Sequence, residues 1–292
     1  MIVNLIGGYI MEFKLYKDLN KFIEETKEYL YRKEVENNLP IGILNRLKSG
    51  EIRWTDETVL LTICSNEDIK LVGVRTPPQA LIVTAYEYES ELIEFLIENL
   101  NENNIEIPGA NGEKGLVNLF KAIYCKINKC EYKLDMNMRI YKLLKVNNLK
   151  KPNGVFREAN SGDIETLSKW ILDEDYMFKS IDTLQKAKEY LLSKINGHRL
   201  YLWEDKEVVS MAINGRETND IAVITGVFTP NKFRKRGYAT ACVEELSRLL
   251  LNGDYNKCAL FTDLSNPVSN SIYMKIGYEP VGDYDSYNII KQ

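Results

Sequence analysis

The residues best suited to chemistry lie at 227–240, where an apolar stretch leads into a basic turn and then into a helical pattern. Four cations and two small residues fill this turn: Lys232, Arg234, Lys235, Arg236, Gly237 and Ala239. Backbone N–H groups at the start of a helix lack helical partners and carry about half a positive charge. Small residues let an anion approach that backbone. The segment therefore predicts a site for a phosphate or diphosphate.

A solvated basic turn before a helix would have the same composition, and it is the plainer interpretation of this segment. The segment is not a Walker loop, because no G-K-[ST] occurs in it, and it is not a dinucleotide fingerprint, because G-x-G-x-x-G is absent. Two details favour a binding site. The turn follows an apolar strand pattern, and a second motif lies downstream at 266–278.

These two motifs together resemble the GNAT superfamily of acetyl-CoA-dependent N-acyltransferases. The run Arg234-Lys235-Arg236-Gly237-Tyr238-Ala239 is similar to the family's Q/R-x-x-G-x-G/A phosphate loop, with alanine in the last position. The run from Asn266 through Tyr273 to Lys275-Ile276-Gly277-Tyr278 is similar to its later N-x-x-x-Y and K-x-G-F segment. The resemblance covers 155–292. The first 145 residues share only the order of elements and lack the phosphate loop.

The resemblance implies a set of acetyl-CoA contacts. In the family, the strand before the loop pairs through its backbone with the pantetheine arm, and a backbone N–H near Val227 would face the thioester oxygen. A simple core strand is the alternative for this segment, and both interpretations are compatible because the backbone would do the binding. The implied contacts are Val227, Phe228, Thr229, Arg234, Lys235, Arg236, Gly237, Tyr238, Ala239, Thr240, Asn266 and Asn270.

The resemblance also makes Tyr273 the candidate general acid. The leaving CoA thiolate needs a proton, and a phenol with a pKa of about 10 holds one at neutral pH. The alternative is an aromatic residue that packs into the core. Asn270 lies one helical turn earlier and shares a face with Tyr273, and a cap or turn role is the alternative for it. For Asn266, the CoA contact and the cap or turn role are equally supported.

The general base is left unassigned. Some family members carry a glutamate on the strand before the loop, but 221–229 contains no acid. A water chain, a residue of another element, or a substrate amine of low pKa would have to serve. We expect His198 at a strand edge or surface, and Cys242 and Cys258 in the core. The acidic run at 173–175 either attracts a cationic amine or is a solvated helix end.

Composition restricts the classes of protein that fit. Lys+Arg total 38 and Asp+Glu total 42, giving a net charge of −4 that does not suggest a nucleic-acid binder. With five cysteines, no CxxC pair and one histidine, no metal site is expected and the thiols are expected to be reduced, as in the cytoplasm. No stretch reaches the ~18 apolar residues of a membrane helix, so no membrane partner is expected.

The elements predict an α/β fold made of two GNAT-like domains, each a mixed central sheet flanked by helices. Residues 1–10 are a possible extension, 11–147 a degenerate GNAT-like domain, and 155–292 the acetyl-CoA-binding catalytic domain. The expected helices begin after Asp18 and Ser161 and cover 89–100, the stretch after 112, 186–195, 237–253 and 269–277. The expected strands are 59–64, 69–74, 80–86, 136–146, 198–204, 208–215, 221–229, 258–263 and 281–290.

The leading hypothesis is an N-acetyltransferase that uses acetyl-CoA as co-substrate. A primary amine of a small molecule, peptide or protein would attack the thioester directly. One alternative is a non-catalytic CoA-binding or regulatory module, which the missing strand carboxylate favours. Another is an interaction domain whose degenerate half supplies the partner surface.

Overall fold

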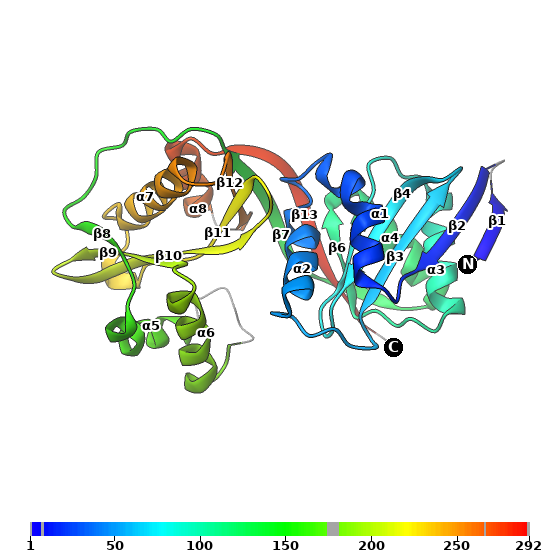
Figure 1. Ribbon diagram of the computed structural model, residues 1–292, viewed down its shortest axis with the longest axis horizontal. Helices are drawn as coiled ribbons and strands as arrows, with labels where there is room; N and C mark the ends of the chain where they lie inside the picture. Colours follow the sequence, from blue (N-terminus) through cyan, green and yellow to red (C-terminus); the bar gives the residue numbers. More distant parts are fainter. Residues whose placement is uncertain (1, 7–8, 174–180, 266, 291–292) are drawn as a thin grey trace. The chain divides into compact units, whose positions relative to one another are not determined.

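The computed structural model describes residues 2–6, 9–173, 181–265 and 267–290. The chain divides into two compact units, whose helices and strands are labelled in Figure 1. Unit 1 comprises Met1–Ile140, Asp263–Ser265 and Val281–Gln292, and unit 2 comprises Tyr141–Thr262 and Asn266–Pro280.

Unit 1 is a mixed sheet with helices on both faces. Its helices are α1 (Leu19–Tyr31), α2 (Asn38–Ser49), α3 (Ser90–Glu102) and α4 (Lys114–Asn128). Its strands are β1 (Ile2–Ile6), β2 (Tyr9–Leu15), β3 (Val59–Ser65), β4 (Asp68–Arg75), β5 (Leu81–Thr84), β6 (Gly109–Glu113) and most of β7 (Glu131–Leu143) and β13 (Glu279–Ile290). The strand order is β1-β2-β3-β4-β5-β6-β13-β7, and β5 and β6 are parallel.

The alternation of apolar residues along β3 gives unit 1 two cores. Leu61 and Ile63 face α3 and α4, where Phe95 and Phe120 complete one cluster. Leu60 faces the opposite side and packs with α1 and α2. Successive side chains of a strand point to opposite faces, so a continuously apolar strand is covered by helices on both sides.

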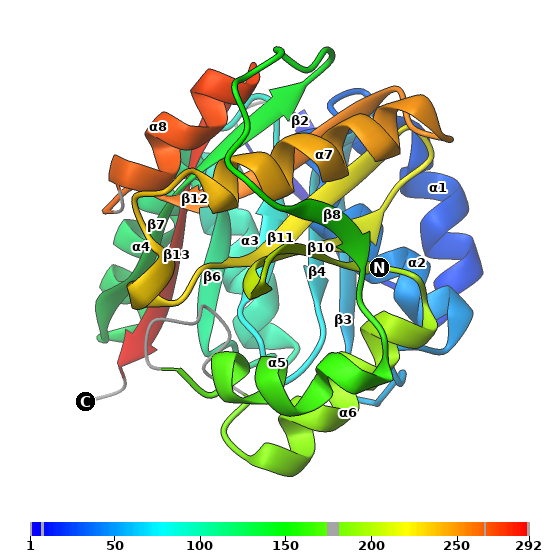
Figure 2. The ribbon, with the colours of Figure 1, turned by 90° about the vertical axis from the view of Figure 1, so that its left-hand side faces the viewer.

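Unit 2 is built in the same way (Figure 2). Its helices are α5 (Ile164–Ile171), α6 (Leu184–Asn196), α7 (Tyr238–Asn252) and α8 (Pro267–Ile276). Its strands are β8 (Val155–Glu158), β9 (Leu200–Asp205), β10 (Glu207–Glu217), β11 (Ile221–Phe228) and β12 (Lys257–Asp263), in the order β12-β11-β10-β9-β8. Only β11 and β12 among these pairs are parallel.

Helices cover both faces of the unit 2 sheet. Ala222 and Ile224 of β11 pack against α7 and α8. On the other face, Met211 and Ile213 of β10 pack with Trp170 of α5 and with α6. The predicted α/β class, with a mixed sheet flanked by helices in each half, is therefore confirmed.

Several local predictions differ from the structure. Ile2–Ile6, part of the expected extension, forms β1 and pairs with β2 in antiparallel register. Helix α2 was not predicted, because Pro40 and Gly42 in its first half are typical of turns. The N-cap expected at Ser161 is Asn160, whose side chain accepts from Gly162 N–H in a capping box that Asp163 completes.

The last strand lies in a different unit from the one that the sequence suggested. All of 155–292 was expected in one domain, but β13 pairs with β6, for example Ser286 with Asn111. Val281–Gln292 is accordingly part of unit 1. Pairing between strands so far apart in the chain leaves no local signal in the sequence.

Candidate functional site

Strand β11 changes its pairing halfway along its length. Its parallel register with β12 covers Ile221–Ile224. On its other side, the register with β10 shifts between Thr225 and Phe228, where β11 has one residue more than β10. Gly226 lies in this bulge with φ +59°. A bulge bends a strand and leaves its extra residue out of the ladder, so the regular pairing of β11 with β10 is interrupted between Thr225 and Phe228, just before the basic loop.

The basic loop ends in a helix start with an open backbone. Gly237 is the N-cap of α7, with φ +85°, and no side chain caps this helix. Lys235 also has a positive φ, +63°, and Arg236 between them does not. Where positive and negative φ angles alternate in this way, successive backbone N–H groups point toward one place and form an anion-binding nest. A Cβ on Gly237 would meet only Pro152, at 3.9 Å, so φ rather than crowding favours glycine here.

Buried anchors on both sides hold this loop while its cations face solvent. Phe233 and Tyr238 are buried, whereas every residue from 234 to 237 is exposed. The Tyr238 hydroxyl donates to Asp205 Oδ2 at 2.6 Å. Arg234 Nε donates to the Thr229 carbonyl at 2.9 Å, so this guanidinium fastens the loop to the end of β11. The start of α7 is therefore open to solvent, and among the described residues only Pro152 lies near a Cβ placed on Gly237.

The side chains at the end of β11 are engaged within the protein. Phe228 is buried, with its ring centroid 5.9 Å from that of Trp170. Thr229 Oγ1 donates to Ser210 Oγ at 2.9 Å, and that hydroxyl donates to the Phe228 carbonyl at 3.2 Å. Val227 packs against the opposite core, under α7 and α8. The side chains of these three residues are thus occupied inside the protein, which leaves their backbone as the part that a ligand could contact.

Tyr273 lies in the last turns of α8 and is 8% exposed. Its ring packs edge-on against Tyr278, with centroids 6.0 Å apart. Its carbonyl accepts from Tyr278 N–H at 3.0 Å across Gly277, which has φ +116°. Among the residues that the structure describes, none is hydrogen-bonded to the Tyr273 hydroxyl. Burial raises the pKa of this phenol to about 12, so it keeps its proton throughout the neutral range.

Asn270 is engaged inside unit 2. Its Oδ1 accepts from Thr262 Oγ1 of β12 at 2.5 Å and from the Tyr141 hydroxyl at 3.2 Å. The amide therefore fixes α8 to the end of β12. Asn266, the other expected asparagine contact, lies outside the described residues, as do residues 174 and 175 of the acidic run.

The remaining candidates lie where the sequence suggested. His198 is at the surface, with its side chain 80% exposed and Nδ1 2.6 Å from Glu158 Oε1. Cys242 and Cys258 are completely buried, and burial raises the pKa of Cys258 to about 12. Ser210 and Asp205, which hold the loop, were not identified from sequence, because each acts through a partner about 20 or more residues away.

The matching region of unit 1 is acidic rather than basic. Its strand β5 ends at Thr84 and α3 begins at Ser90, and the loop between them contains Glu87 and Glu89. Glu91 follows in the first turn of α3. Carboxylates at a helix N-terminus complement its dipole, but they repel a phosphate. Unit 1 thus has no counterpart of the basic loop.

Across the described ranges, no group of three His, Cys, Asp or Glu side chains is placed to hold a metal ion. No helix in those ranges is both long and apolar enough to cross a membrane.

Comparison with known proteins supports this description of the fold. Residues 204–285, which include the bulge, the basic loop and α8, match the family model described as FR47-like protein. An acetyltransferase of the GNAT family from Colwellia psychrerythraea has a similar structure, with a TM-score of 0.61 and 13% identity. That likeness covers 96% of this chain and 100% of the other. This chain is a GNAT-fold protein.

Two further solved structures share the GNAT fold over nearly the whole chain. A GCN5-related N-acetyltransferase from Sphaerobacter thermophilus has a TM-score of 0.67 at 11% identity, covering 97% of this chain and 96% of the other. A tandem GNAT protein from the clavulanic acid biosynthesis pathway, solved without AcCoA, has a TM-score of 0.52 at 10% identity. That likeness covers 96% and 98% of the two chains. No curated protein matches this sequence.

The buried tyrosines at the end of α8 predict a loss of stability at high pH. Burial raises the pKa of Tyr273 to about 12 and raises that of Tyr278 well above its usual value. Their contribution to stability is complete below pH ~10 and is lost as pH rises, because only the unfolded chain releases these protons. We expect urea unfolding to show a free energy that falls between pH 10 and 12 by up to about 1.4 kcal/mol per pH unit for each tyrosine.

Tyr278→Phe is the informative variant for this effect. It should be less stable at pH 8, because Ser247 loses the partner that the Tyr278 hydroxyl gives it at 2.9 Å. Its free energy of unfolding should also fall less steeply above pH 10. If the free energy of unfolding of this variant depended on pH as that of the wild type does, the raised pKa of Tyr278 would be contradicted.

Proposed function

We propose that this protein is an N-acetyltransferase that binds acetyl-CoA at 227–240 and transfers the acetyl group to a primary amine. The observation that carries this proposal is the uncapped, solvent-exposed N-terminus of α7, entered through the positive φ angles of Lys235 and Gly237. An anion is the natural ligand of such a helix end. A diphosphate with a long amide-bearing arm also suits the interrupted ladder of β11 just before this loop.

The residues present fit the parts of acetyl-CoA in order along the chain. The amides of 238–240 would donate to the diphosphate, and Lys235 and Arg236 would add positive charge at its exposed side. The backbone of 227–229 would pair with the pantetheine amides, since the side chains there are held inside the protein. When bound, acetyl-CoA supplies the thioester that an amine can attack.

Tyr273 would hold and deliver the proton that the reaction requires. The amine nitrogen forms a bond to the acetyl carbon, the carbon–sulfur bond breaks, and the electron pair remains on sulfur. Tyr273 gives its hydroxyl proton to that sulfur, and the proton that the amine loses returns through water to the Tyr273 oxygen. A backbone N–H near Val227 would stabilise the negative charge on the carbonyl oxygen. Burial keeps Tyr273 protonated for this step.

The absence of a carboxylate on β11 favours a second candidate, a CoA-binding module without catalysis. The two functions are separated by titrating free CoA thiol while the purified chain is incubated with acetyl-CoA and a panel of primary amines. We expect CoA release above the rate of hydrolysis with at least one amine, and acetylated amine in equal amount. Tight acetyl-CoA binding with no release for any amine would support the module instead.

The panel should include amines with pKa values from about 7 to 10.5. A chain that lacks a strong base acts only on the neutral fraction of the amine. We therefore expect amines of low pKa to react faster than amines of high pKa at pH 7. The ratio of the two rates should be smaller at pH 9. The same ratio of rates at both pH values would show that the protein supplies a base of its own.

A further inference from the structure

Two cysteine thiols of unit 1 lie in direct contact at the end of α4. Cys125 Sγ and Cys130 Sγ are 2.6 Å apart, and both residues are half-buried. The other cysteines of the chain, at 64, 242 and 258, have no thiol as a partner among the described contacts. The sequence shows no CxxC pair, so the contact depends on how the helix ends.

The backbone explains why residues five apart meet. Lys129 ends α4 in the left-handed conformation, with φ +49° and ψ +53°, and its N–H donates to the Cys125 carbonyl. Cys130 N–H donates to the same carbonyl at 3.3 Å. This bond from the residue after the left-handed position is the mark of a Schellman motif, which brings the side chains at its two ends together.

Two other helices end in the same motif with apolar pairs. In α3, Ile105 N–H donates to the Leu100 carbonyl at 2.8 Å across Asn104, which has φ +55°. In α8 the pair is Tyr273 and Tyr278. Cys125 and Cys130 thus occupy positions that normally make a fixed hydrophobic contact. The backbone conformation that ends α4 therefore brings the two thiols together.

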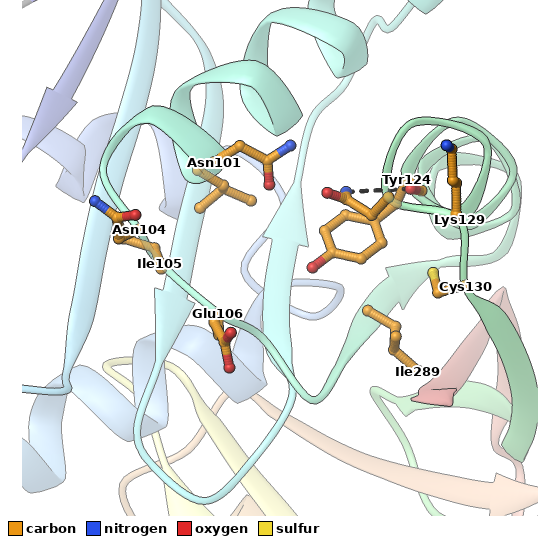
Figure 3. A pocket seen from close by; sticks show the side chains of 10 residues that line it. Asn101, Asn104, Ile105, Glu106, Tyr124, Lys129, Cys130 and Ile289 are labelled. Carbon is orange, nitrogen blue, oxygen red and sulfur yellow. Dashed lines mark hydrogen bonds between the residues drawn. The ribbon is translucent and has the colours of Figure 1, made fainter. Parts of the chain in front are cut away.

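A cavity gives small molecules access to this pair. It has a volume of about 570 Å³ and lies between the ends of α3 and α4, with Cys130 in its wall. Figure 3 shows Cys130 and Tyr124 on the α4 side and Asn104 and Ile105 on the α3 side. Polar side chains such as Asn101 and Asn104 share the lining with apolar ones such as Leu100 and Ile289, so a hydrophilic thiol reagent finds hydrogen-bond partners inside it.

We propose that Cys125 and Cys130 form a reversible disulfide with a low-molecular-weight disulfide as the oxidant. The Cys130 thiolate attacks one sulfur of the oxidant, which releases one small thiol and leaves a mixed disulfide on Cys130. The Cys125 thiolate then attacks the Cys130 sulfur and releases the second small thiol. Two protein sulfurs are oxidised, the oxidant disulfide is reduced, and the two protein protons end on the released thiols.

The order of attack follows from the surroundings of the two thiols. Cys130 lines the open cavity, whereas Cys125 does not. Burial raises the pKa of Cys125 to about 12, and its hydrogen bond with Cys130 contributes to this. A mixed disulfide on Cys130 removes that hydrogen bond. The thiol with the better access therefore reacts first, and the one behind it resolves the intermediate.

Peptide mapping tests the proposal directly on the full chain. The protein is equilibrated with excess glutathione disulfide at pH 8, alkylated, and digested with trypsin. Cleavage after lysine separates residues 122–126 from 130–133, so the disulfide appears as one cross-linked pair of peptides that reduction splits. Before alkylation, the intact mass of the oxidised protein should be about 2 Da below that of the reduced protein, because two hydrogen atoms are lost. Cys125→Ser should instead trap glutathione on Cys130.

Cys64→Ser is the matched control, since this half-buried cysteine has no thiol as a partner, and it should form the same cross-linked peptides as the wild type. Wild-type protein that remains fully reduced, or that links these cysteines to other thiols instead, would overturn the proposal. The mapping of the wild type needs no variant, so misfolding of a substituted chain cannot obscure the result. Acetyl-CoA binding is not part of the readout, so the outcome is independent of the proposed transferase activity.

Discussion

Gly237→Asp is expected to weaken acetyl-CoA binding by roughly thirtyfold or more, equivalent to a loss of about 2 kcal/mol. The new carboxylate would stand at the N-terminus of α7, where it competes for the helix N–H groups and repels the diphosphate. Gly237 is exposed and its neighbourhood is open, so the substitution displaces no packed side chain. Isothermal titration calorimetry of both proteins measures the difference.

Gly50→Asp controls for backbone strain. Gly50 ends α2 with φ +79°, close to the +85° of Gly237, and no atom lies within 4 Å of a Cβ placed there. Both substitutions force a side chain into the left-handed region at a cost of about 1–2 kcal/mol. Only Gly237→Asp should lose acetyl-CoA. Equal acetyl-CoA affinity in the wild type and both variants would show that the start of α7 is not part of the binding site.

Tyr273→Phe is expected to slow acetyl transfer by roughly tenfold or more while acetyl-CoA still binds normally. The phenylalanine ring keeps the packing against Tyr278, and no hydrogen bond with another described residue is lost. The change therefore removes little except the proton that the departing thiolate needs. The measurement is kcat from CoA release together with the dissociation constant of acetyl-CoA from calorimetry.

Tyr278→Phe is the matched control for the transfer rate. It removes a buried phenol from the same helix end, but one that already has Ser247 as its partner. We expect this variant to lose stability and to keep a turnover number within a factor of about two of the wild type. A Tyr273→Phe enzyme that turns over as fast as the wild type would exclude Tyr273 as the general acid.

The parts of the fold that could be predicted are those whose signal is local. The run from Arg234 to Ala239 combines cations, a glycine and a following apolar periodicity, so the loop and the start of α7 are visible in the sequence. Strands such as β3 and β11 are continuous apolar runs between turn residues. The capping of α1 by Asp18 is likewise visible in the sequence, because the carboxylate accepts from the amides two and three residues later.

The parts that could not be predicted depend on distant partners or on backbone geometry. The pairing of β13 with β6 joins residues about 175 apart in the chain, such as Ser286 and Asn111. The bulge at Gly226 depends on a register with β10 that no single segment encodes. Asn270 looks like a ligand contact in sequence, yet Thr262 and Tyr141 occupy its amide oxygen. Cys125 and Cys130 come into contact only because α4 ends at Lys129, and their spacing in the sequence does not show this.

The most direct test of the proposed site is a crystal structure of the protein grown with CoA. The account predicts that the diphosphate oxygens lie within about 3.2 Å of the backbone nitrogens of residues 238–240, with the pantetheine arm along 227–229. CoA held elsewhere on the chain, or a diphosphate that contacts only side chains away from the start of α7, would contradict it.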